Sequence, residues 1–493
     1  MIPRLGPTLR WLAPLLPVGL IAAIILVLAW FDSKPLPFPT PAQQELVVLV
    51  QPGSLTFDNA DPNNTSGFEH DLIELFAKEL GIGIRHVIAP PGEFSAQLKA
   101  HNVHLAAAWL TPQANTEYSF SPAFMQSHDV LVQHEASLPI DEIKDLAGRT
   151  VHVLAGSRQA AAMQAFKKEI SGLQVVELQR HTPLDLLEAV ASGRHDLAVV
   201  DSAQFNVAQQ LTPSLQASLE IGDPHPVAWA FPKNANTELV ARATDFLTRI
   251  RKDPDFARMK DRYFGHIHRL KNDDIRKFVE LSKTQLPRLR RHFHAAQTAT
   301  GLDWRLLAAL AYQESKWDAN ATSPTGVRGV MMLTEDTADR MGVSNRLDAE
   351  ESILAGARYL GMLRGEIPED TREPDRTWLA LSAYNIGPGH FRAGLRIGRQ
   401  LKADTRAWHE MKRILPLLAK PQYYERLKSG RARGGEAVIL VENVRNYFDI
   451  LKRHEAPYRS GSVDSLDIAL PGLKLKKPGK KLQASPMLSL PTM

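Results

Sequence analysis

The sequence predicts a multidomain protein in which an α/β domain is followed by a mainly α-helical domain. At 493 residues the chain is too long for one ordinary domain and indicates two or three. From about Glu45 to His266, short apolar runs alternate with helical stretches, which is the pattern of an α/β domain. From Asn272 onward the pattern is that of helices joined by short turns, with no strand run of comparable quality.

Residues 1–32 are predicted to be a signal peptide or a membrane anchor. Arg4 and Arg10 precede an uncharged apolar run from Trp11 to Phe31, which is long enough for export or for spanning a bilayer. No small-x-small cleavage site follows this run. A cleaved signal and a retained anchor therefore both stay open.

The composition excludes several classes of chemistry. The absence of cysteine excludes disulfides, thiolate metal sites, cysteine nucleophiles and a lipid anchor carried on a cysteine. The formal net charge of +5 favours an anionic polymer or a membrane surface as partner, and without a clustered basic patch it does not indicate nucleic-acid binding. The 17 histidines form no His-x-x-x-His pair on a convincing helix, so no metal and no cofactor is expected.

Two polar residues of the first domain follow predicted strands. Strands are expected at residues 45–50, 150–154 and 196–201, and a helix is expected at 68–80. Asp201 ends the third of these strands and is either a ligand contact or a structural residue at the strand end. Ser157 stands before a helix, so it either caps that helix or donates a hydrogen bond to a ligand.

A glutamate near the end of an apolar helical run is the strongest candidate for chemistry. Asp303 can cap the helix, and good helix formers follow it up to Glu314. Leu307 and Leu310 precede Glu314 by seven and four positions, so the carboxylate lies along an apolar stripe. Desolvation there raises the pKa of a carboxyl group, as a general acid at neutral pH requires. A glutamate at the edge of an apolar stripe can also be purely structural.

Two separated motifs resemble the lytic transglycosylase family. In the first, Glu314-Ser315 precedes Ser323-Pro324 and the Gly-Val-Met-Met-Leu segment at 329–333, and the second is Ala-Tyr-Asn-Ile-Gly at 383–387. The resemblance covers about residues 290–455 and implies a lysozyme-like helical domain.

By this resemblance Glu314 is the catalytic acid. It would protonate the oxygen between N-acetylmuramic acid and N-acetylglucosamine, while the acetamido group stabilises the oxocarbenium-like centre. The Glu314 carboxylate would then take the proton of the muramyl 6-hydroxyl, whose attack gives a 1,6-anhydromuramyl end. Ser315, Ser323, Tyr384 and Asn385 would contact or position the substrate.

The acids near this motif fit such a mechanism, and one residue departs from the family pattern. Ordinary glycosidases use two carboxylates. The nearest acids after Glu314 are Asp318, Glu335 and Asp336, and none of them is part of the motif as a second catalytic carboxylate. Met332 stands where the family pattern has a glutamine, so a sugar contact of that glutamine is not carried over.

The first domain resembles the bilobed solute-binding proteins of amino-acid uptake. The matching segments are 67–72, 119–122, 146–151 and 196–201. In that family a cleft between two lobes binds the ligand, with an acid for its amine and an arginine for its carboxylate. Asp201 falls at the position of the acid, but Ala114 stands where the arginine is expected. A peptide from the cell wall is therefore a better candidate ligand than a free amino acid.

The two resemblances in this order imply the membrane-bound lytic murein transglycosylase F family. The expected parts are a Pro-rich linker, a solute-binding-like domain, a lytic domain and a basic, disordered tail, at residues 33–44, 45–268, 269–458 and 459–493. The resemblance implies a periplasmic enzyme peripheral on the outer membrane, with peptidoglycan strands as partner and stem peptides as candidate ligand. Two alternatives are a binding protein for transport or signalling and a lysozyme-type hydrolase.

Overall fold

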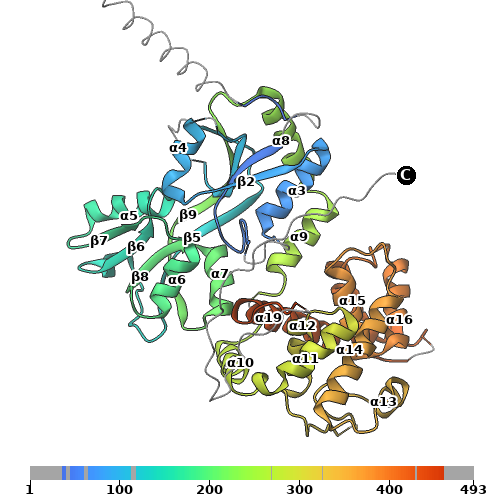
Figure 1. Ribbon diagram of the computed structural model, residues 1–493. Coiled ribbons are helices and arrows are strands. Elements are labelled where there is room, and N and C mark those ends of the chain that lie inside the picture. Colours follow the sequence, from blue (N-terminus) through green and yellow to red (C-terminus); the bar gives the residue numbers. More distant parts are fainter. Residues whose placement is uncertain are drawn as a thin grey trace, which may run out of the picture.

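The structure is a computed structural model that describes residues 36–39, 45–59, 65–100, 102–112, 118–267, 269–324, 326–427 and 430–459. Within these residues the chain forms an α/β body and a helical body that lie against each other (Figure 1). The predicted export segment and the predicted tail beyond Arg459 lie outside them.

A mixed sheet forms the centre of the α/β body. Its strands in the described residues are β1 (Leu46–Val50), β2 (Ile84–Ile88), β3 (Leu105–Leu110), β4 (Tyr118–Phe120), β5 (Met125–His134), β6 (Thr150–Leu154), β7 (Gln174–Leu178), β8 (Leu197–Asp201) and β9 (Leu215–Pro232). Their order is β2-β1-β3-β9-β5-β8-β6-β7, with β4 beside β9. β1 is parallel to β2 and β3, and β6 is parallel to β7 and β8. The long antiparallel strands β5 and β9 join these two parallel groups.

The two strand groups belong to two lobes, because each group has a hydrophobic core of its own. One core includes Leu46, Phe68 and Trp229, and another includes Val132 and Leu187. β9 continues through both lobes, which makes it and β5 the connection between them (Figure 1). The predicted bilobed α/β architecture is confirmed.

Helices cover the faces of this sheet. They are α3 (Phe68–Leu80), η1 (Pro91–Glu93), α4 (Phe94–Lys99), η2 (Ile143–Leu146), α5 (Arg158–Glu169), α6 (Pro183–Ala191), α7 (Ser202–Leu211), α8 (Thr237–Ile250) and α9 (Pro254–Phe264). α3 has the bounds expected from the sequence, because Gly81 in the left-handed conformation ends it and buried Phe68, Leu72 and Phe76 share its inner face.

The second body consists mainly of helices around one hydrophobic core. They are α10 (Asn272–Thr284), α11 (Leu286–Thr300), α12 (Trp304–Ser315), α13 (Glu335–Met341), α14 (Ala349–Glu366), α15 (Asp375–Ile386), α16 (Pro388–Gln400), α17 (Trp408–Ile414), η3 (Leu415–Ala419), α18 (Pro421–Tyr424) and α19 (Gly434–His454). α12 lies between α11, α14 and α19 and is buried at every position from Trp304 to Tyr312 (Figure 1). Within the described ranges, none of the helices has the length and apolar character that a membrane span requires.

Part of the predicted Pro-rich linker packs on the α/β body. Leu36 and Phe38 contact two of its hydrophobic clusters. The carbonyl oxygen of Pro37 lies 3.0 Å from Nε2 of His104. Residues 36–39 are therefore part of this body and not a free spacer.

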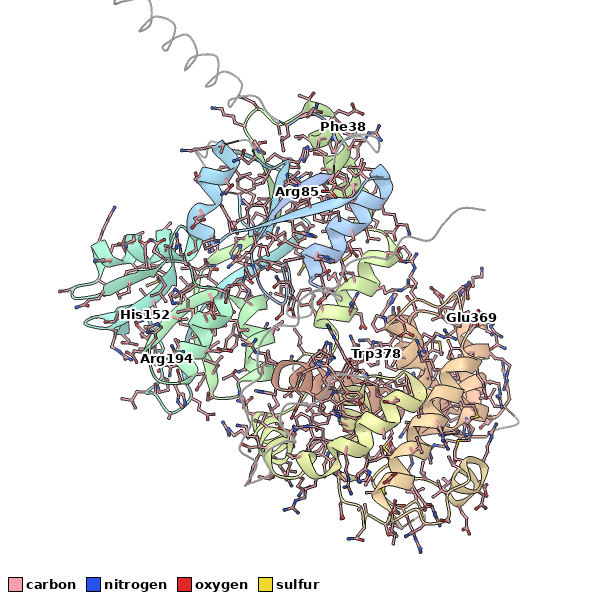
Figure 2. The ribbon with its side chains drawn as sticks, in the orientation of Figure 1. Phe38, Arg85, His152, Arg194, Glu369 and Trp378 are labelled. Carbon is pink, nitrogen blue, oxygen red and sulfur yellow. The ribbon has the colours of Figure 1, made fainter. Side chains whose placement is uncertain are left out.

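The two bodies meet along α9, α17 and α19, where ion pairs connect them. Arg445 on α19 lies 3.1 Å from the carboxylate of Asp261 on α9, and the same carboxylate pairs with Lys412 on α17. Arg258 on α9 lies 3.1 Å from the carboxylate of Asp375, the first residue of α15. Figure 2 shows Trp378 of α15 at this junction.

Candidate active site

Glu314 is held in the last turn of α12 by the way this helix begins and ends. Asp303 caps its N-terminus by accepting a hydrogen bond from the backbone N–H of Arg305 at 2.8 Å. After Ser315 the chain leaves the helix through two left-handed residues, Lys316 (φ 57°) and Trp317 (φ 64°). The Trp317 indole N–H donates to the carbonyl of Ala308 at 2.8 Å and fixes this turn against the helix.

The surroundings of Glu314 favour a protonated carboxyl group near neutral pH. Its side chain is partly buried, and Leu307 and Leu310 of the same face are fully buried. Burial raises the pKa of Glu314 to about 7, as its place on an apolar stripe predicts. The nearby acids Asp318 and Glu335 are exposed, and burial is the one cause of this shift among the described residues.

Ser315 connects the helix to the segment that faces it. Its hydroxyl lies 2.8 Å from the carbonyl oxygen of Val330 and 3.1 Å from that of Ala311. On the other side of the segment, the backbone N–H of Met331 donates to the hydroxyl of Ser352 at 3.2 Å. The 329–333 segment is thereby fixed from α12 and from α14.

Gly329 is required for this segment to lie where it does. Its φ is 81°, and a Cβ atom there would stand 1.8 Å from the carbonyl oxygen of Arg346. No side chain fits that space, and L-residues rarely adopt that conformation. Gly326 has a similar φ of 82° but has open space around it.

Tyr384 lies next to Glu314 and is tied to the same segment. Its hydroxyl donates to the carbonyl oxygen of Met331 at 2.8 Å. Burial raises the pKa of Tyr384 well above its ordinary value, and the nearby charge of Glu314 raises it further. Tyr384 therefore stays a neutral hydrogen-bond donor, while the next residue, Asn385, is exposed at the end of α15.

The Ser323 turn precedes this segment and is closed by its own hydrogen bonds. The Ser323 hydroxyl accepts from the backbone N–H of Val327 at 3.3 Å, and the Ser323 carbonyl accepts from that of Gly326 at 3.0 Å. The backbone N–H of Gly329 then donates to the carbonyl of Ala321 at 2.9 Å. The turn and the 329–333 segment form one connected unit.

In the α/β body, Asp201 has a structural role at the end of β8. It is 2% exposed and caps α7 by accepting from the backbone N–H of Ala203 at 2.9 Å. Its other oxygen lies 3.6 Å from Nε2 of His225, which also contacts Asp129 at 3.2 Å. Burial raises the pKa of Asp201. Ser157 caps α5 by accepting from the backbone N–H of Ala160 at 3.1 Å, one of the two roles that the sequence left open.

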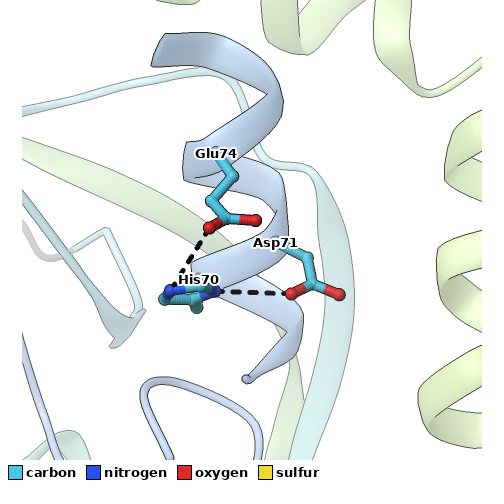
Figure 3. Close-up of side chains that lie close together, drawn as sticks. All are labelled: His70, Asp71 and Glu74. Atoms are coloured by element: carbon cyan, nitrogen blue, oxygen red, sulfur yellow. Dashed lines mark hydrogen bonds and ion pairs between the residues drawn. The ribbon is translucent and has the colours of Figure 1, made fainter. Parts of the chain in front are cut away.

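Within the described part of the chain, two groups of His and acidic side chains have the spacing of metal ligands. Asp129 of the group with Asp201 and His225 is already paired with the guanidinium of Arg158. The second group is shown in Figure 3 and consists of His70, Asp71 and Glu74. Its two carboxylates lie at opposite nitrogens of the imidazole, at 3.4 and 3.7 Å.

Comparison with known proteins decides the family. The model of the transglycosylase SLT domain matches residues 291–406, and that of bacterial extracellular solute-binding proteins, family 3, matches residues 46–266. A membrane-bound lytic murein transglycosylase F from Nitrosospira multiformis is 40% identical over 433 residues, which cover 87% of this chain and 90% of that protein. Another, from Methylobacillus flagellatus, is 40% identical over 455 residues, covering 91% and 96%. The chain belongs to the membrane-bound lytic murein transglycosylase F family.

Solved structures similar to this transglycosylase F chain correspond to its α/β body. A mutant of ArgBP from T. maritima is 20% identical, with a TM-score of 0.41, over 44% of this chain and 95% of that one. An ancestral arginine-binding protein bound to arginine is 21% identical, with the same score, over 45% and 99%. Scores this low say nothing about the ligand of the transglycosylase F chain.

The structure groups the site residues that the sequence predicted for this transglycosylase F chain. Glu314, Ser315 and Tyr384 lie around the 329–333 segment, Ser323 lies in the turn before it, and exposed Asn385 follows Tyr384 in α15. Sequence reasoning missed Ser352, whose hydroxyl holds the backbone of that segment from α14. No local pattern could have revealed it, because the contact is made across the core.

Proposed function

We propose that this chain cleaves the β-1,4 bond between N-acetylmuramic acid and N-acetylglucosamine without water, leaving 1,6-anhydromuramyl ends. Membership in the transglycosylase F family supports a lyase that acts on peptidoglycan. The observation that carries the finer proposal is one carboxyl group, Glu314, whose pKa burial raises to about 7, with no second buried carboxylate described beside it.

In the proposed reaction Glu314 acts first as acid and then as base. Its proton goes to the glycosidic oxygen as the bond from that oxygen to the anomeric carbon breaks, and the N-acetylglucosamine residue leaves as an alcohol. The acetamido group of the substrate stabilises the developing cation. The Glu314 carboxylate then accepts the proton of the muramyl 6-hydroxyl while that oxygen bonds to the anomeric carbon. The acid is regenerated and no water is consumed.

The neighbouring polar residues support this cycle by position. Tyr384 and Ser315 donate hydrogen bonds to two carbonyls of the 329–333 segment, at Met331 and Val330, and thereby fix this segment beside the end of α12. We assign Ser323 and Asn385 to substrate contact, because Ser323 lies in the turn before that segment and exposed Asn385 follows Tyr384 in α15. Met332, partly exposed in that segment, offers an apolar surface in place of an amide.

The mass of the product tests the proposal. Purified protein incubated with cell-wall sacculi is expected to release muropeptides that are one water lighter than hydrolysis products, and Glu314→Gln is expected to release none. Asp318→Asn is the matched control, because Asp318 is an exposed acid four residues further on. Products that contain the added water would replace the proposal with a lysozyme-type hydrolase, and an active Glu314→Gln variant would remove Glu314 from the reaction.

We propose in addition that a stem peptide binds between the lobes of the α/β body and adjusts the rate. A cavity of about 220 Å³ lies between them, lined by Gln51, Ile88 and Pro90 of one lobe and by Arg180 and Thr182 of the other. Such a cavity is close to the lower size of small-ligand sites. Asp201 and Ser157, at the N-termini of α7 and α5, are the polar groups that we assign to this ligand, although neither lines that cavity.

Stem tetrapeptide titrated into the protein tests this regulation. Binding seen by calorimetry and a changed rate of sacculus digestion are expected. Asp201→Asn should weaken binding while the melting temperature stays close to that of the parent, because asparagine also caps helices. The proposed regulation would be contradicted by the absence of any binding heat at millimolar peptide, or by binding that leaves the rate of sacculus digestion unchanged. Either result would leave the proposed lytic activity intact.

We propose that the protein lies in the periplasm and attaches peripherally to the outer membrane. We also propose that residues 45–268 and 269–458 are two functional modules. The word membrane-bound in the names of the relatives supports the first, and the separate hydrophobic cores support the second. Recovery of the full chain with outer-membrane vesicles after gradient separation, and its release by high salt, are the expected results.

A further inference from the structure

A row of arginines covers the outer face of α16. Arg392, Arg396 and Arg399 follow one another at intervals of four and three residues, which places them on one side of the helix. All three are exposed. By the rise of a helix the row extends about 10 Å. We call these three residues the arginine stripe.

The opposite face of α16 explains why the stripe points outward. Phe391 and Ile397 are buried against α15, α17 and η3. Two glycines on that face allow close packing, since a Cβ at Gly394 would stand 2.8 Å from the side chain of Leu415 and one at Gly398 would stand 2.7 Å from that of Thr405. Figure 1 shows α16 at the outer edge of the helical body.

The stripe is largely unpaired within the protein. In the described part of the chain, Arg392 forms an ion pair with Glu366 at 3.5 Å, and Arg396 and Arg399 form none. Like charges three and four residues apart on a helix repel one another. The fold gains little from these exposed charges, and they are available to an anionic partner.

The stripe follows Tyr384 and Asn385 closely along the chain. A single residue, Gly387, separates α15 from α16, so Arg392 lies seven residues beyond Asn385 and eight beyond Tyr384. We propose that a glycan strand bound at Glu314 passes the start of α16 and that the arginine stripe binds the carboxylates of the stem peptides on this strand, so that the enzyme prefers peptide-bearing strands.

Charge complementarity selects this partner. The sugars of such a strand are uncharged because their amines are acetylated, so its negative charge lies on the peptides. Arginine binds carboxylates with two parallel hydrogen bonds, and a row of exposed arginines suits a repeating anionic strand. The inference rests on the proposed function, because it assumes that the strand is cleaved at Glu314.

The test replaces Arg392, Arg396 and Arg399 together by glutamine. On intact sacculi at low salt, KM is expected to rise about tenfold with kcat little changed, since each exposed contact contributes a modest amount. An amidase that strips the peptides frees the lactyl carboxylate of each muramic acid, so the stripped strands are then converted to their neutral lactyl amides. On these neutral stripped strands the variant and the parent should be equal. The KM of the parent should rise with added NaCl, and that of the variant should respond less. Arg→Lys at the three positions should restore most of the binding.

The matched control removes the same charge elsewhere. Lys167, Lys168 and Arg194 are exposed in the α/β body, and Figure 2 shows Arg194 far from α16. Their replacement by glutamine should leave KM unchanged. Equal losses on sacculi and on stripped strands, or no loss on either, would overturn the proposal. So would a stripe variant that keeps its KM on sacculi but no longer sediments with phosphatidylglycerol vesicles, which would assign the stripe to lipid. If the parent itself makes no anhydro product, the proposed function fails first.

Discussion

Glu314 lies near the end of a helix in apolar surroundings, and the pH dependence of the reaction follows from its burial. The pKa near 7 means that the acid holds its proton up to neutral pH. Above that value the protonated fraction falls tenfold for each pH unit. The kcat/KM of sacculus digestion is therefore expected to fall with that slope above about pH 7. A profile that is flat from pH 6 to pH 9 would mean that Glu314 is not the acid.

The same pKa makes a prediction about stability. The pKa of Glu314 rises from 4.5 to about 7 on folding, so the charged carboxylate is disfavoured in the folded state. Stability is full below about pH 4.5 and is lost as the pH rises through 7. Glu314→Gln should therefore have a higher free energy of unfolding than the parent at pH 8, by at most about 3 kcal/mol. Solvent at the partly exposed side chain screens the charge and makes the difference smaller. Thermal melts from pH 4.5 to pH 8.5 measure this, and a constant difference between the two proteins would contradict it.

At the residue scale the sequence predicted the apolar surroundings of Glu314 better than the contacts of Tyr384 and Ser315. Leu307 and Leu310 place Glu314 on an apolar stripe by spacing alone, and the raised pKa bears this out. The partners of Tyr384 and Ser315 are backbone carbonyls of another segment. Such contacts depend on how distant parts of the chain pack, which helix periodicity does not contain.

At the scale of elements, the 329–333 segment requires a glycine at position 329, whereas Gly326 in the preceding turn has room for a Cβ atom. Gly329→Ala should cost about 3 kcal/mol or more and abolish activity, because the new Cβ would displace the backbone at Arg346. Gly326→Ala has the same unfavourable φ but open space, so it should cost about 1 kcal/mol and keep most of the activity. Denaturant unfolding and sacculus digestion of both variants make the comparison. Equal costs would mean that the contact at Arg346 is unimportant.

Elements with a clear local pattern were predicted closely, and those without one were not. The helix at 68–80 and the strand at 150–154 match the structure because their apolar periodicity and end residues agree. The long strand β9 was not predicted. It passes from one lobe to the other with a register shift against β5, and its charged and apolar residues follow no single period.

At the scale of the whole molecule, the sequence indicated two modules but not how they meet. The change of pattern near Asn272 separates the α/β body from the helical one. The junction is made by single charged residues from helices far apart in the chain, such as Arg258 and Asp375. Scattered charges of this kind are indistinguishable in the sequence from ordinary surface residues.

Asp261 connects α9 to the helical body through its ion pairs with Arg445 and Lys412. Burial opposes its ionisation, but Arg445 and Lys412 lower its pKa, so its stabilising effect is present above about pH 3.8 and is lost in stronger acid. Asp261→Asn should cost about 3 kcal/mol, because Arg445 is only 2% exposed and loses a charged partner. Calorimetry at pH 7 should then show two unfolding transitions in place of one, as the bodies uncouple. Glu79→Gln, which breaks an exposed pair with Arg249, should cost less than about 1 kcal/mol and leave the transition undivided. An Asp261→Asn protein that melts like this control would show that packing, and not charge, holds the two bodies together.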